Sequence, residues 1–599
     1  MKSSIPKLDD DTKRRWRRRF NRRRRGAIQL GQQADASIEK LIIRRFDRLV
    51  SVRRFVLLWV GLFVLLILIS VAQLRNLSAY YQVLKPVPGG LYNEGLVGSF
   101  TNANPIYATG AADTAVSRLV FSGLFKYNDD NQLVGDLANG WTLSANQTDY
   151  VVHLKKNIFW QDGRPFTADD VVFTYHTIQN ANAQSSLISS WKDITVTKQS
   201  TYSVNFSLPN PLSSFPYALT NGILPAHLLK SVPPEQLRSA AFNTAPVGTG
   251  PFELKFINVT GNTTADRQQR IALAAYDRYY AGAPKLDGFS IITFSDDNHL
   301  IAAFKQKQLN AITGLESVPA ELAGDSSVQT YTTPLTSAVM AFFNNSRPLL
   351  SDVNIRKALE ESVDRAQLES LFDTPVKPVD GPLLRNQLGY DPSIVEASYN
   401  FAAASQTLDQ AGWTVGQGGI RYKNGQPLSF VLKSQDTPQY TRVAEFLQRQ
   451  WAKLGVKVTA QYYDADDLQS IVIANHDYDA LLYGINIGVD PDVFAYWDSS
   501  QASVSSQGHL NLSEYKSAAA DQALEAGRTR SDPAVRVLKY KAFLTAWVQD
   551  VPALALYQPN LLYITHGPVF NYQRKADNGE LDQFYNVNQW EVRQQKQDI

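Results

Sequence analysis

One apolar run near the start of the chain constrains its fold more than any other feature. Residues 55–74 read FVLLWVGLFVLLILISVAQL, hold no charged side chain, and are flanked by Arg54 and Arg75. As a helix, a run of this length spans about 30 Å, the thickness of the hydrocarbon core of a bilayer. The sequence therefore predicts one N-terminal transmembrane helix at 55–74, followed by a polar chain of more than 500 residues.

Charge divides the chain at the same place. Residues 1–54 hold 18 Lys and Arg against 6 Asp and Glu, whereas the rest of the chain holds 41 against 50. Basic flanks stay on the cytoplasmic side of a membrane, so we expect a single-pass protein of the cell membrane. Its N-terminus would be cytoplasmic and its C-terminal body extracytoplasmic. A cleaved signal peptide is the alternative, although its apolar region usually has about 7–15 residues and ends in small residues.

The basic head, residues 1–54, leaves two interpretations open. Its segment RRWRRRFNRRRR, at 14–25, has the arginine density that neutralises nucleic-acid phosphates. The same arginines orient a membrane helix and contact anionic lipid heads, which we favour beside an apolar run, so no nucleic-acid partner is expected. Residues 37–54 place their apolar side chains near one helical face. This pattern predicts a helix on the inner membrane surface, with a cytosolic partner helix as the alternative.

Several classes of chemistry are disfavoured by what the sequence lacks. The chain has no cysteine, which removes disulfides, thiolate nucleophiles, cysteine metal sites and a lipid-modified N-terminal cysteine. It also lacks a G-x-S-x-G elbow, an H-E-x-x-H pair and a phosphate-binding Gly-Lys-Ser/Thr loop. We therefore expect no enzyme, no cofactor and no metal. His476, beside Asp477 and Asp479 in NHDYD, is a weaker metal candidate than it is an ordinary loop histidine.

The body beyond residue 80 alternates between two kinds of periodicity, which predicts the α/β class. Strand patterns lie at 151–160, 201–209 and 456–463, and helical patterns at 167–181, 352–372, 441–454, 518–527 and 535–549. Thr167 is the expected N-cap of its helix, with Asp169 and Asp170 in the first turn.

A series of motifs in the body resembles one known family. The first is LVFSGLFKYNDDNQLVGDLANGWTLS (119–144), followed by YVVHLKKNIFWQDGRPFTADDVVFTYHTI (150–178). The later ones are PVGTGPFEL (246–254), NNSRPLLSDVNIRKALEESVDRAQL (344–368), LDQAGW (408–413), residues 447–457 and RVLKYKAFLTAWVQDVPALALY (536–557). In content and order they resemble the extracellular solute-binding proteins of family 5, the dipeptide and oligopeptide class, over nearly all of residues 85–565.

The resemblance implies an α/β, two-lobed periplasmic-binding-protein-like fold of type II, with an extra inserted domain. Lobe I would comprise residues 85–123, 246–340 and 560–599, and the inserted domain residues 124–245. Lobe II would be 341–559, with chain crossings near residues 340 and 560 as the hinge. Residues 75–84 would link the body to the transmembrane helix.

The function that the resemblance implies is capture of a peptide between the lobes and its delivery to the permease of an ABC importer. Closure of two lobes on a ligand lets such an importer sense it. Two alternatives stay open: the same fold acting as a sensor or assembly factor, or as the binder of a non-peptide solute such as a sugar or metal chelate.

The first candidate ligand site is LLYGINIGVDPDVFAYWDSS, at 481–500, where a buried strand runs into Gly, Asn, Asp and Pro. Peptide-binding members of the family carry an acid about four positions before the proline, but this chain has Ile487 there. Either Asp490 or Asp492 would take a cationic ligand end, or the ligand has no free ammonium at this place. An N-cap role for the acids is the structural alternative. The candidate ligand contacts here are Tyr483, Asn486, Asp490, Asp492 and Trp497.

The second candidate lies in GSFTNANPIYATGAADTAV, at 98–116, where family members place the first-lobe edge of the cleft. Asn102, Asn104 and Tyr107 would hydrogen-bond the ligand, with turn formation as the equal alternative. In contrast, we expect QDGRPFTADD, at 161–170, to be a turn and a helix cap without a ligand role.

Overall fold

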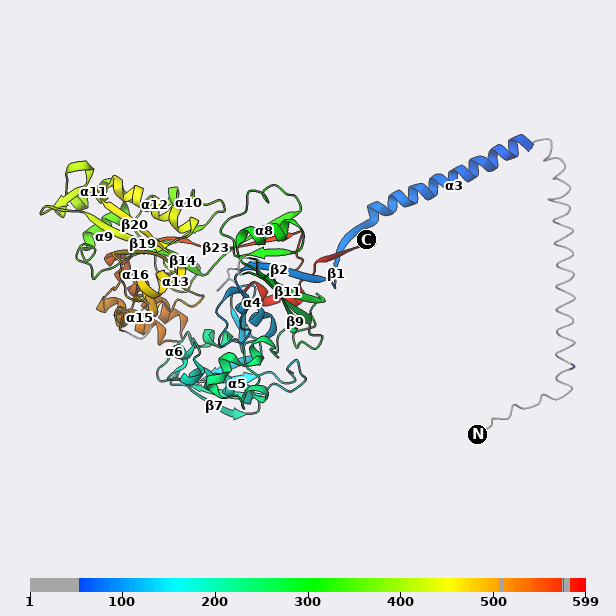
Figure 1. Cartoon of the computed structure of the whole chain (residues 1–599), viewed down its shortest axis with the longest axis horizontal. Helices are drawn as coiled ribbons and strands as arrows, with labels where there is room; N and C mark the ends of the chain where they lie inside the picture. The colour runs from blue at the N-terminus through cyan, green and yellow to red at the C-terminus, as the bar shows by residue number, and fades with distance from the viewer. Residues whose placement is uncertain are drawn as a thin grey trace. The chain divides into compact units, whose positions relative to one another are not determined.

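The computed structural model of the chain describes residue 14 and residues 53–263, 266–505, 510–573, 575 and 582–598 (Figure 1). It divides into two compact units, Met1–Lys85 with Gln594–Ile599, and Pro86–Arg593. Apart from Arg14, Arg53 and Arg54, the basic head lies outside the described residues. Residues 37–52 of the proposed surface helix lie there too, so both stay predictions.

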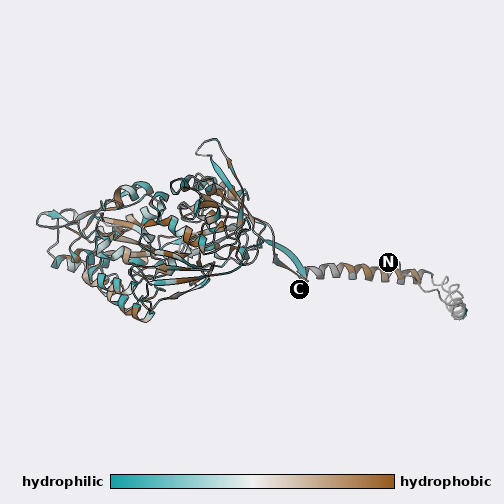
Figure 2. Cartoon of the chain, turned by 90° about the horizontal axis from the view of Figure 1, so that it is seen from below, coloured by the Kyte–Doolittle hydropathy of each residue, from teal (hydrophilic) through white to brown (hydrophobic). Residues whose placement is uncertain are grey.

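The first unit contains helix α3, Arg53–Tyr81, which carries the apolar run. Its segment Phe55–Gln73 has a mean hydropathy of 3.0 and no buried residues, and Figure 2 shows it as a brown stretch. Of the helices described, it alone is long and apolar enough to cross a membrane, although a signal sequence meets the same test. Strand β1 (Gln82–Val87) follows α3 and pairs with β24 (Arg593–Asp598), from the other end of the chain.

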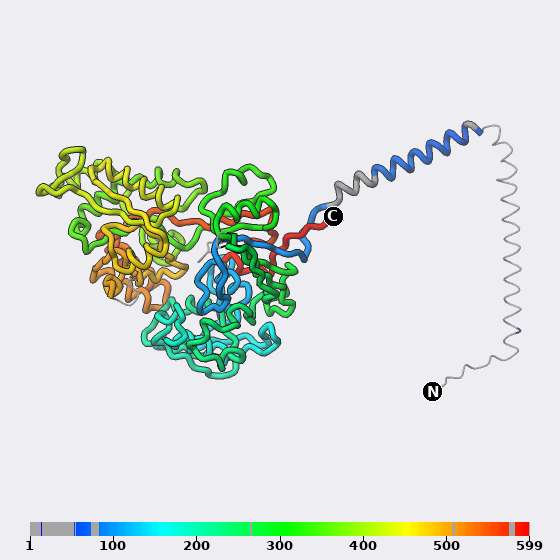
Figure 3. Tube along the Cα trace, in the orientation of Figure 1, coloured from blue at the N-terminus to red at the C-terminus, as the bar shows by residue number. Residues whose placement is uncertain are grey.

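The second unit contains two large sheets, of which the first has the strand order β13-β23-β12-β2-β11-β10-β9. β2 runs parallel to β11 and β12, and the other neighbours are antiparallel. Successive side chains of its strands point to opposite faces and enter two apolar clusters. Helix α4 (Ala111–Val120) belongs to one cluster and α8 (Asp297–Lys305) to the other. Figure 3 shows by colour that blue, green and red segments meet here. The strands are β2 (Leu91–Val97), β9 (Phe252–Thr260), β10 (Gln268–Ala275), β11 (Gly288–Phe294), β12 (Ala311–Thr313), β13 (Val328–Pro334) and β23 (Asn560–His566).

The second sheet has the order β15-β22-β14-β21-β19-β20, in which β19 runs parallel to both β20 and β21. Its strands are β14 (Ser337–Phe343), β15 (Lys377–Pro378), β19 (Ser429–Gln435), β20 (Lys457–Tyr463), β21 (Ala480–Asn486) and β22 (Ala553–Gln558). The helices of this region are α9 (Val353–Glu361), α10 (Arg365–Glu369), α11 (Phe401–Gln410), α12 (Pro438–Lys453), α13 (Ala465–Asp467), α14 (Phe494–Trp497), α15 (Ala518–Arg528) and α16 (Pro533–Asp550). A small sheet of β16 (Thr414–Val415), β17 (Arg421–Lys423) and β18 (Gln426–Pro427) completes it.

A third group of strands comes between β2 and β9 in the sequence, and thus interrupts the seven-stranded sheet. β5-β6-β8-β7 form one sheet and β3-β4 a ribbon. They enclose an aromatic core with helix α5. The elements are β3 (Phe125–Tyr127), β4 (Leu133–Gly135), β5 (Ala138–Leu143), β6 (Asp149–Leu154), α5 (Ala168–Gln179), α6 (Ile188–Trp191), β7 (Thr195–Ser200), β8 (Ser203–Ser207) and α7 (Ala226–Leu229).

The chain passes twice between the two large sheets. One passage joins β13 to β14 and the other joins β22 to β23. The two passages contact each other, because Leu335 N donates to Pro559 O at 2.9 Å. We call residues 335–339 and 557–561 the hinge segments. This distribution of strands supports the division into lobe I, inserted domain and lobe II, and the exact boundaries stay a proposal.

Local sequence signals account for several helix boundaries. Thr167 caps α5 in a capping box with Asp170, as its sequence predicts. The helical stretch at 352–372 is two helices, α9 and α10. The break occurs because the Asp364 side chain accepts hydrogen bonds from Ala366 N and Gln367 N and starts a new helix.

Candidate functional site

In both large sheets, the carboxyl ends of some strands lie close to the hinge segments. In lobe I, β12 ends at Thr313 and is followed by the loop 314–317. In lobe II, β21 ends at Asn486, and β19 ends at Gln435 just before helix α12. Ligands of open α/β sheets bind at the carboxyl ends of such strands. These loops therefore lie where a ligand site is expected.

A cavity of about 360 Å³ lies among these strand ends. It draws residues from both lobes and from both hinge segments, so its shape depends on how the lobes stand about the hinge. Its lining combines aromatic, amide and charged side chains, which is the composition of a site for a polar organic solute. The polar and aromatic lining residues are Glu316, Ser317, Ser337, Phe372, Asp373, Thr374, Gln439, Tyr440, Arg442, Asn486, Tyr557 and Asn560.

One hydrogen bond crosses this cavity from lobe I to lobe II. Glu316 Oε2, in the loop after β12, accepts from Gln439 N at 3.0 Å. Gln439 is the second residue of α12, where backbone N–H groups have no partner within the helix. The neighbouring N–H of Tyr440 is met by the Thr437 side chain at 3.3 Å. The Glu316 carboxylate thus accepts a hydrogen bond at the N-terminus of α12, a helix of the opposite lobe. The positive end of the helix dipole lies there and stabilises the negative charge.

Aromatic side chains form one wall of the cavity. The rings of Phe372 and Tyr557 lie 4.6 Å apart, and Tyr557 is almost fully buried. Tyr440 packs against the strand β21 at Gly484, where a Cβ atom would come within 2.9 Å of the Tyr440 hydroxyl. Burial raises the pKa of Tyr440, with a smaller contribution from the Glu316 charge, so its hydroxyl stays protonated.

A second cavity, of about 510 Å³, lies on the other face of the hinge segments. The first cavity is lined by Leu335, Ser337 and Val339, whereas the second is lined by Thr336 between them. Successive side chains of an extended chain point to opposite faces, which accounts for this alternation. The charged residues of the second cavity are Asp129, Asp130, Lys377, Arg385 and Lys575.

Comparison with known proteins assigns the chain to a family. The profile of the bacterial extracellular solute-binding proteins, family 5 (Middle), matches residues 132–506. The chain belongs to family 5 of the bacterial extracellular solute-binding proteins. The resemblance and the two-lobed α/β fold predicted from the motifs are thereby confirmed.

The relatives cover nearly the whole body of this family 5 protein. The oligopeptide-binding protein AppA of Bacillus subtilis is 28% identical over 533 residues, 87% of this chain and 95% of AppA. The structure of AppA in complex with a nonapeptide has a TM-score of 0.68 and 27% identity, and covers 85% of this chain and 100% of AppA. NikZ of Campylobacter jejuni, solved with Ni(L-His), has a TM-score of 0.69 and covers 84% of this chain and 99% of NikZ. At 24% identity, NikZ shows likeness of fold.

Among the predicted ligand contacts, Asn486 lines the first cavity. Its side-chain oxygen also accepts from Gly488 N at 3.0 Å, which shapes the turn after β21. Tyr483 lies three residues earlier on the same strand, and its hydroxyl donates to Gln469 Oε1 at 3.3 Å. Asn486 is the last residue of β21 and Tyr483 is its middle one, and the ligand role of both stays a prediction.

The predicted contacts of the first lobe are engaged in bonds within their own loop and to residues 183 and 243 of the inserted domain. Asn102 Oδ1 accepts from Asn104 N at 2.8 Å, and Asn104 is fully buried with its amide bonded to Asn243 Oδ1. The Tyr107 hydroxyl donates to Ala183 O at 2.6 Å. The bonds that Asn102 and Asn104 accept are those of the turn-forming alternative, whereas Tyr107 forms none within the turn. The ligand role of the three residues stays a prediction.

The two acids of the D-P-D segment are paired within the protein. Asp490 accepts two hydrogen bonds from Arg536, at 2.6 and 2.8 Å, and both side chains are buried. Asp492 Oδ2 accepts from Ser214 Oγ at 2.7 Å and lies 3.2 Å from Arg528. A ligand ammonium would have to displace these partners. The N-cap alternative is wrong for both acids, because α14 is preceded by Val493 and no side chain caps it. The acids pair with arginines instead, and their ligand role stays a prediction.

Trp497 belongs to the interior of lobe II. Its ring has no exposed surface and packs 5.8 Å from Phe342 and 5.5 Å from Trp547. Its position in an aromatic turn that follows β21 in the sequence is consistent with burial in the core. Its role as a cleft wall stays a prediction.

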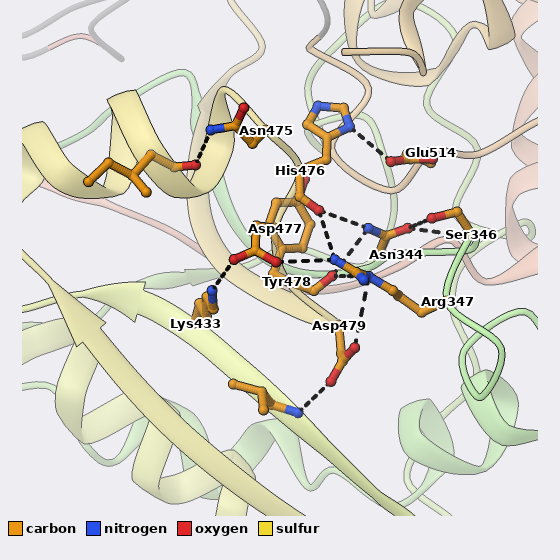
Figure 4. Close-up of polar contacts among 12 residues, drawn as sticks. Asn344, Ser346, Arg347, Lys433, Asn475, His476, Asp477, Tyr478, Asp479 and Glu514 are labelled. Atoms are coloured by element: carbon orange, nitrogen blue, oxygen red, sulfur yellow. Dashed lines mark hydrogen bonds and ion pairs between the residues drawn. The ribbon is translucent and has the colours of Figure 1, made fainter.

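The NHDYD segment forms a polar cluster at the start of β21 (Figure 4). His476 lies 3.3 Å from Glu514, while Asp477 pairs with Lys433 at 3.0 Å, and Asp479 turns to other partners. In the part of the chain that the structure describes, no three His, Asp or Glu side chains lie close enough to hold a metal ion. The contacts to Glu514 and Lys433 tie the segment to neighbouring parts of lobe II.

Of the polar and aromatic residues that line the first cavity, the sequence pointed only to Asn486; its charged residues Glu316, Asp373 and Arg442, and the hydrogen-bonded Gln439, were among those missed. Two signals were present. The glycine after a short strand marks the loop 314–317, and a helix start follows the strand at 429–435. Only the fold shows that these two places face each other across the hinge.

Proposed function

We propose that the chain is an extracytoplasmic solute-binding protein, held at the membrane by α3, that captures peptides between its lobes. It would deliver them to the permease subunits of an ABC importer. Its membership of family 5 supports this role, and the family consists of solute-binding proteins and not of enzymes. The observation that carries the proposal is the cavity shared by both lobes at the carboxyl ends of their strands.

The peptide class is supported by the relatives and by the lining. AppA was solved with a nonapeptide, and its sequence matches this chain along almost its whole length. The cavity offers aromatic surface for apolar side chains, and Arg442, Asn486 and Asn560 for backbone and terminal groups. Closure follows because a ligand that contacts both lobes binds the closed arrangement better than the open one.

Thermal unfolding of the full chain in detergent with a mixed peptide library tests this function. A specific peptide at about 100-fold its Kd should stabilise the protein by about 2.7 kcal/mol. If no peptide raises the unfolding temperature but a sugar or a metal chelate does, the solute is not a peptide. Ile487, in place of an acid, is the observation that favours that second candidate. A chain that responds to none of these would support a sensor or assembly role.

The anchor has its own test. With α3 retained, the mature protein keeps its N-terminal residues and stays in the membrane fraction, with its body digested by protease added outside the cell. The excess of arginine before Phe55 supports this orientation. Mass spectrometry that finds a mature N-terminus after residue 70 would establish a cleaved signal peptide in its place.

A further inference from the structure

The cationic end of a peptide needs a carboxylate, and the segment at 487–492 does not offer one. Ile487 is buried, and its N–H donates to Thr336 O at 3.0 Å. Asp490 and Asp492 both face arginines. A peptide ammonium in the cleft must therefore be recognised elsewhere.

Two other carboxylates line the first cavity. Glu316 reaches it from lobe I and Asp373 from lobe II, and both side chains are exposed. Arg442 is the cation among the charged lining residues, so the lining carries a net negative charge. The only hydrogen bond between the protein and the Glu316 carboxylate that the described residues show uses Oε2. Its second oxygen is available to a ligand.

The charge of Glu316 acts on the cavity wall. It adds to the rise in the pKa of Tyr440 and Tyr557, for both of which burial is the largest cause. Both hydroxyls belong to residues that line the cavity. A cation placed beside the Glu316 carboxylate would thus meet a favourable potential.

We propose that Glu316 is the residue that recognises the cationic group of the ligand, with Asp373 as a second carboxylate on the opposite lobe. The preferred ligands are peptides with a free N-terminal ammonium, which rests on the proposed function. Since Glu316 also contacts α12, a cation bound to it lies at the contact between lobes. Recognition of the charge and closure of the lobes then depend on the same side chain.

The test compares pairs of peptides that differ only in acetylation of the N-terminus, by isothermal titration of the full chain. The wild-type protein should bind the free peptide at least about tenfold more tightly, as a hydrogen bond to a charged group implies. Glu316→Gln keeps an oxygen that accepts from Gln439 N but loses the charge. It should remove most of this preference, and any loss of affinity for the acetylated peptide should be smaller than the loss for the free peptide. Asp373→Asn should reduce the preference less.

Asp436→Asn is the matched control, because Asp436 is an exposed acid just before α12 that does not line the cavity. It should leave the preference intact. Equal affinity of wild type for free and acetylated peptides, or an undiminished preference in Glu316→Gln, would overturn the inference while the peptide function stands. If no peptide of either kind binds wild type, the proposed function fails, and this inference fails with it. A uniform loss of affinity for both peptides in Glu316→Gln would show a structural role instead.

Discussion

Removal of the Asp490 carboxylate separates the structural reading of the D-P-D segment from the ligand reading. Asp490 and Arg536 form a bidentate pair with distances of 2.6 and 2.8 Å, and each side chain is 7% exposed. Burial by itself lowers the pKa of Arg536, but the hydrogen bonds and charge of Asp490 outweigh it and raise that pKa above its usual value. Asp490→Ala would leave the guanidinium charged and buried. We expect the free energy of unfolding to fall by about 3–5 kcal/mol.

The assay is chemical unfolding of the purified chain, followed by tryptophan fluorescence, with Asp162→Ala as the control. Asp162 pairs with His227 at the surface, so its removal should cost less than about 1 kcal/mol. A double variant, Asp490→Leu with Arg536→Met, removes both charges and should be more stable than Asp490→Ala. The reasoning is refuted if Asp490→Ala unfolds like wild type. Loss of peptide binding in a variant of unchanged stability would establish Asp490 as a ligand contact.

Three further outcomes are expected. Burial raises the pKa of Glu94 to about 8 from 4.5, so its contribution to stability is full below about pH 4.5 and is lost as pH rises through 8. Glu94→Gln should flatten the pH dependence of the unfolding free energy by about 1.4 kcal/mol per pH unit in that window, and an unchanged slope would contradict it. Ser214→Ala removes a bond between the inserted domain and lobe II. It should widen the distance between spin labels on these two parts and weaken ligand affinity by up to about tenfold. The labels can be attached to introduced cysteines, because the chain has no native cysteine. Deletion of residues 1–75 should give a soluble monomer that binds ligand, and aggregation of a folded product would argue against the separate anchor.

Local signals were sufficient for the class, the apolar helix and several element boundaries. The run at 55–74 needed only its length and lack of charge, and Thr167 needed only its position before a helix with an acid three residues later. The motifs and their order were enough to identify the family, because each short pattern specifies a turn or helix that forms from neighbouring residues. The break at Asp364 was missed, since the apolar periodicity continues across it.

Neighbouring residues are enough to specify an apolar helix of membrane length, an α/β body and the family. Which acids are available to a ligand depends on contacts between distant parts of the chain. Asp490 meets an arginine 46 residues away, and Glu316 meets a backbone N–H 123 residues away in the other lobe. Such pairings are set by the packing of whole sheets about the hinge, and periodicity over one helix or strand carries no information about them.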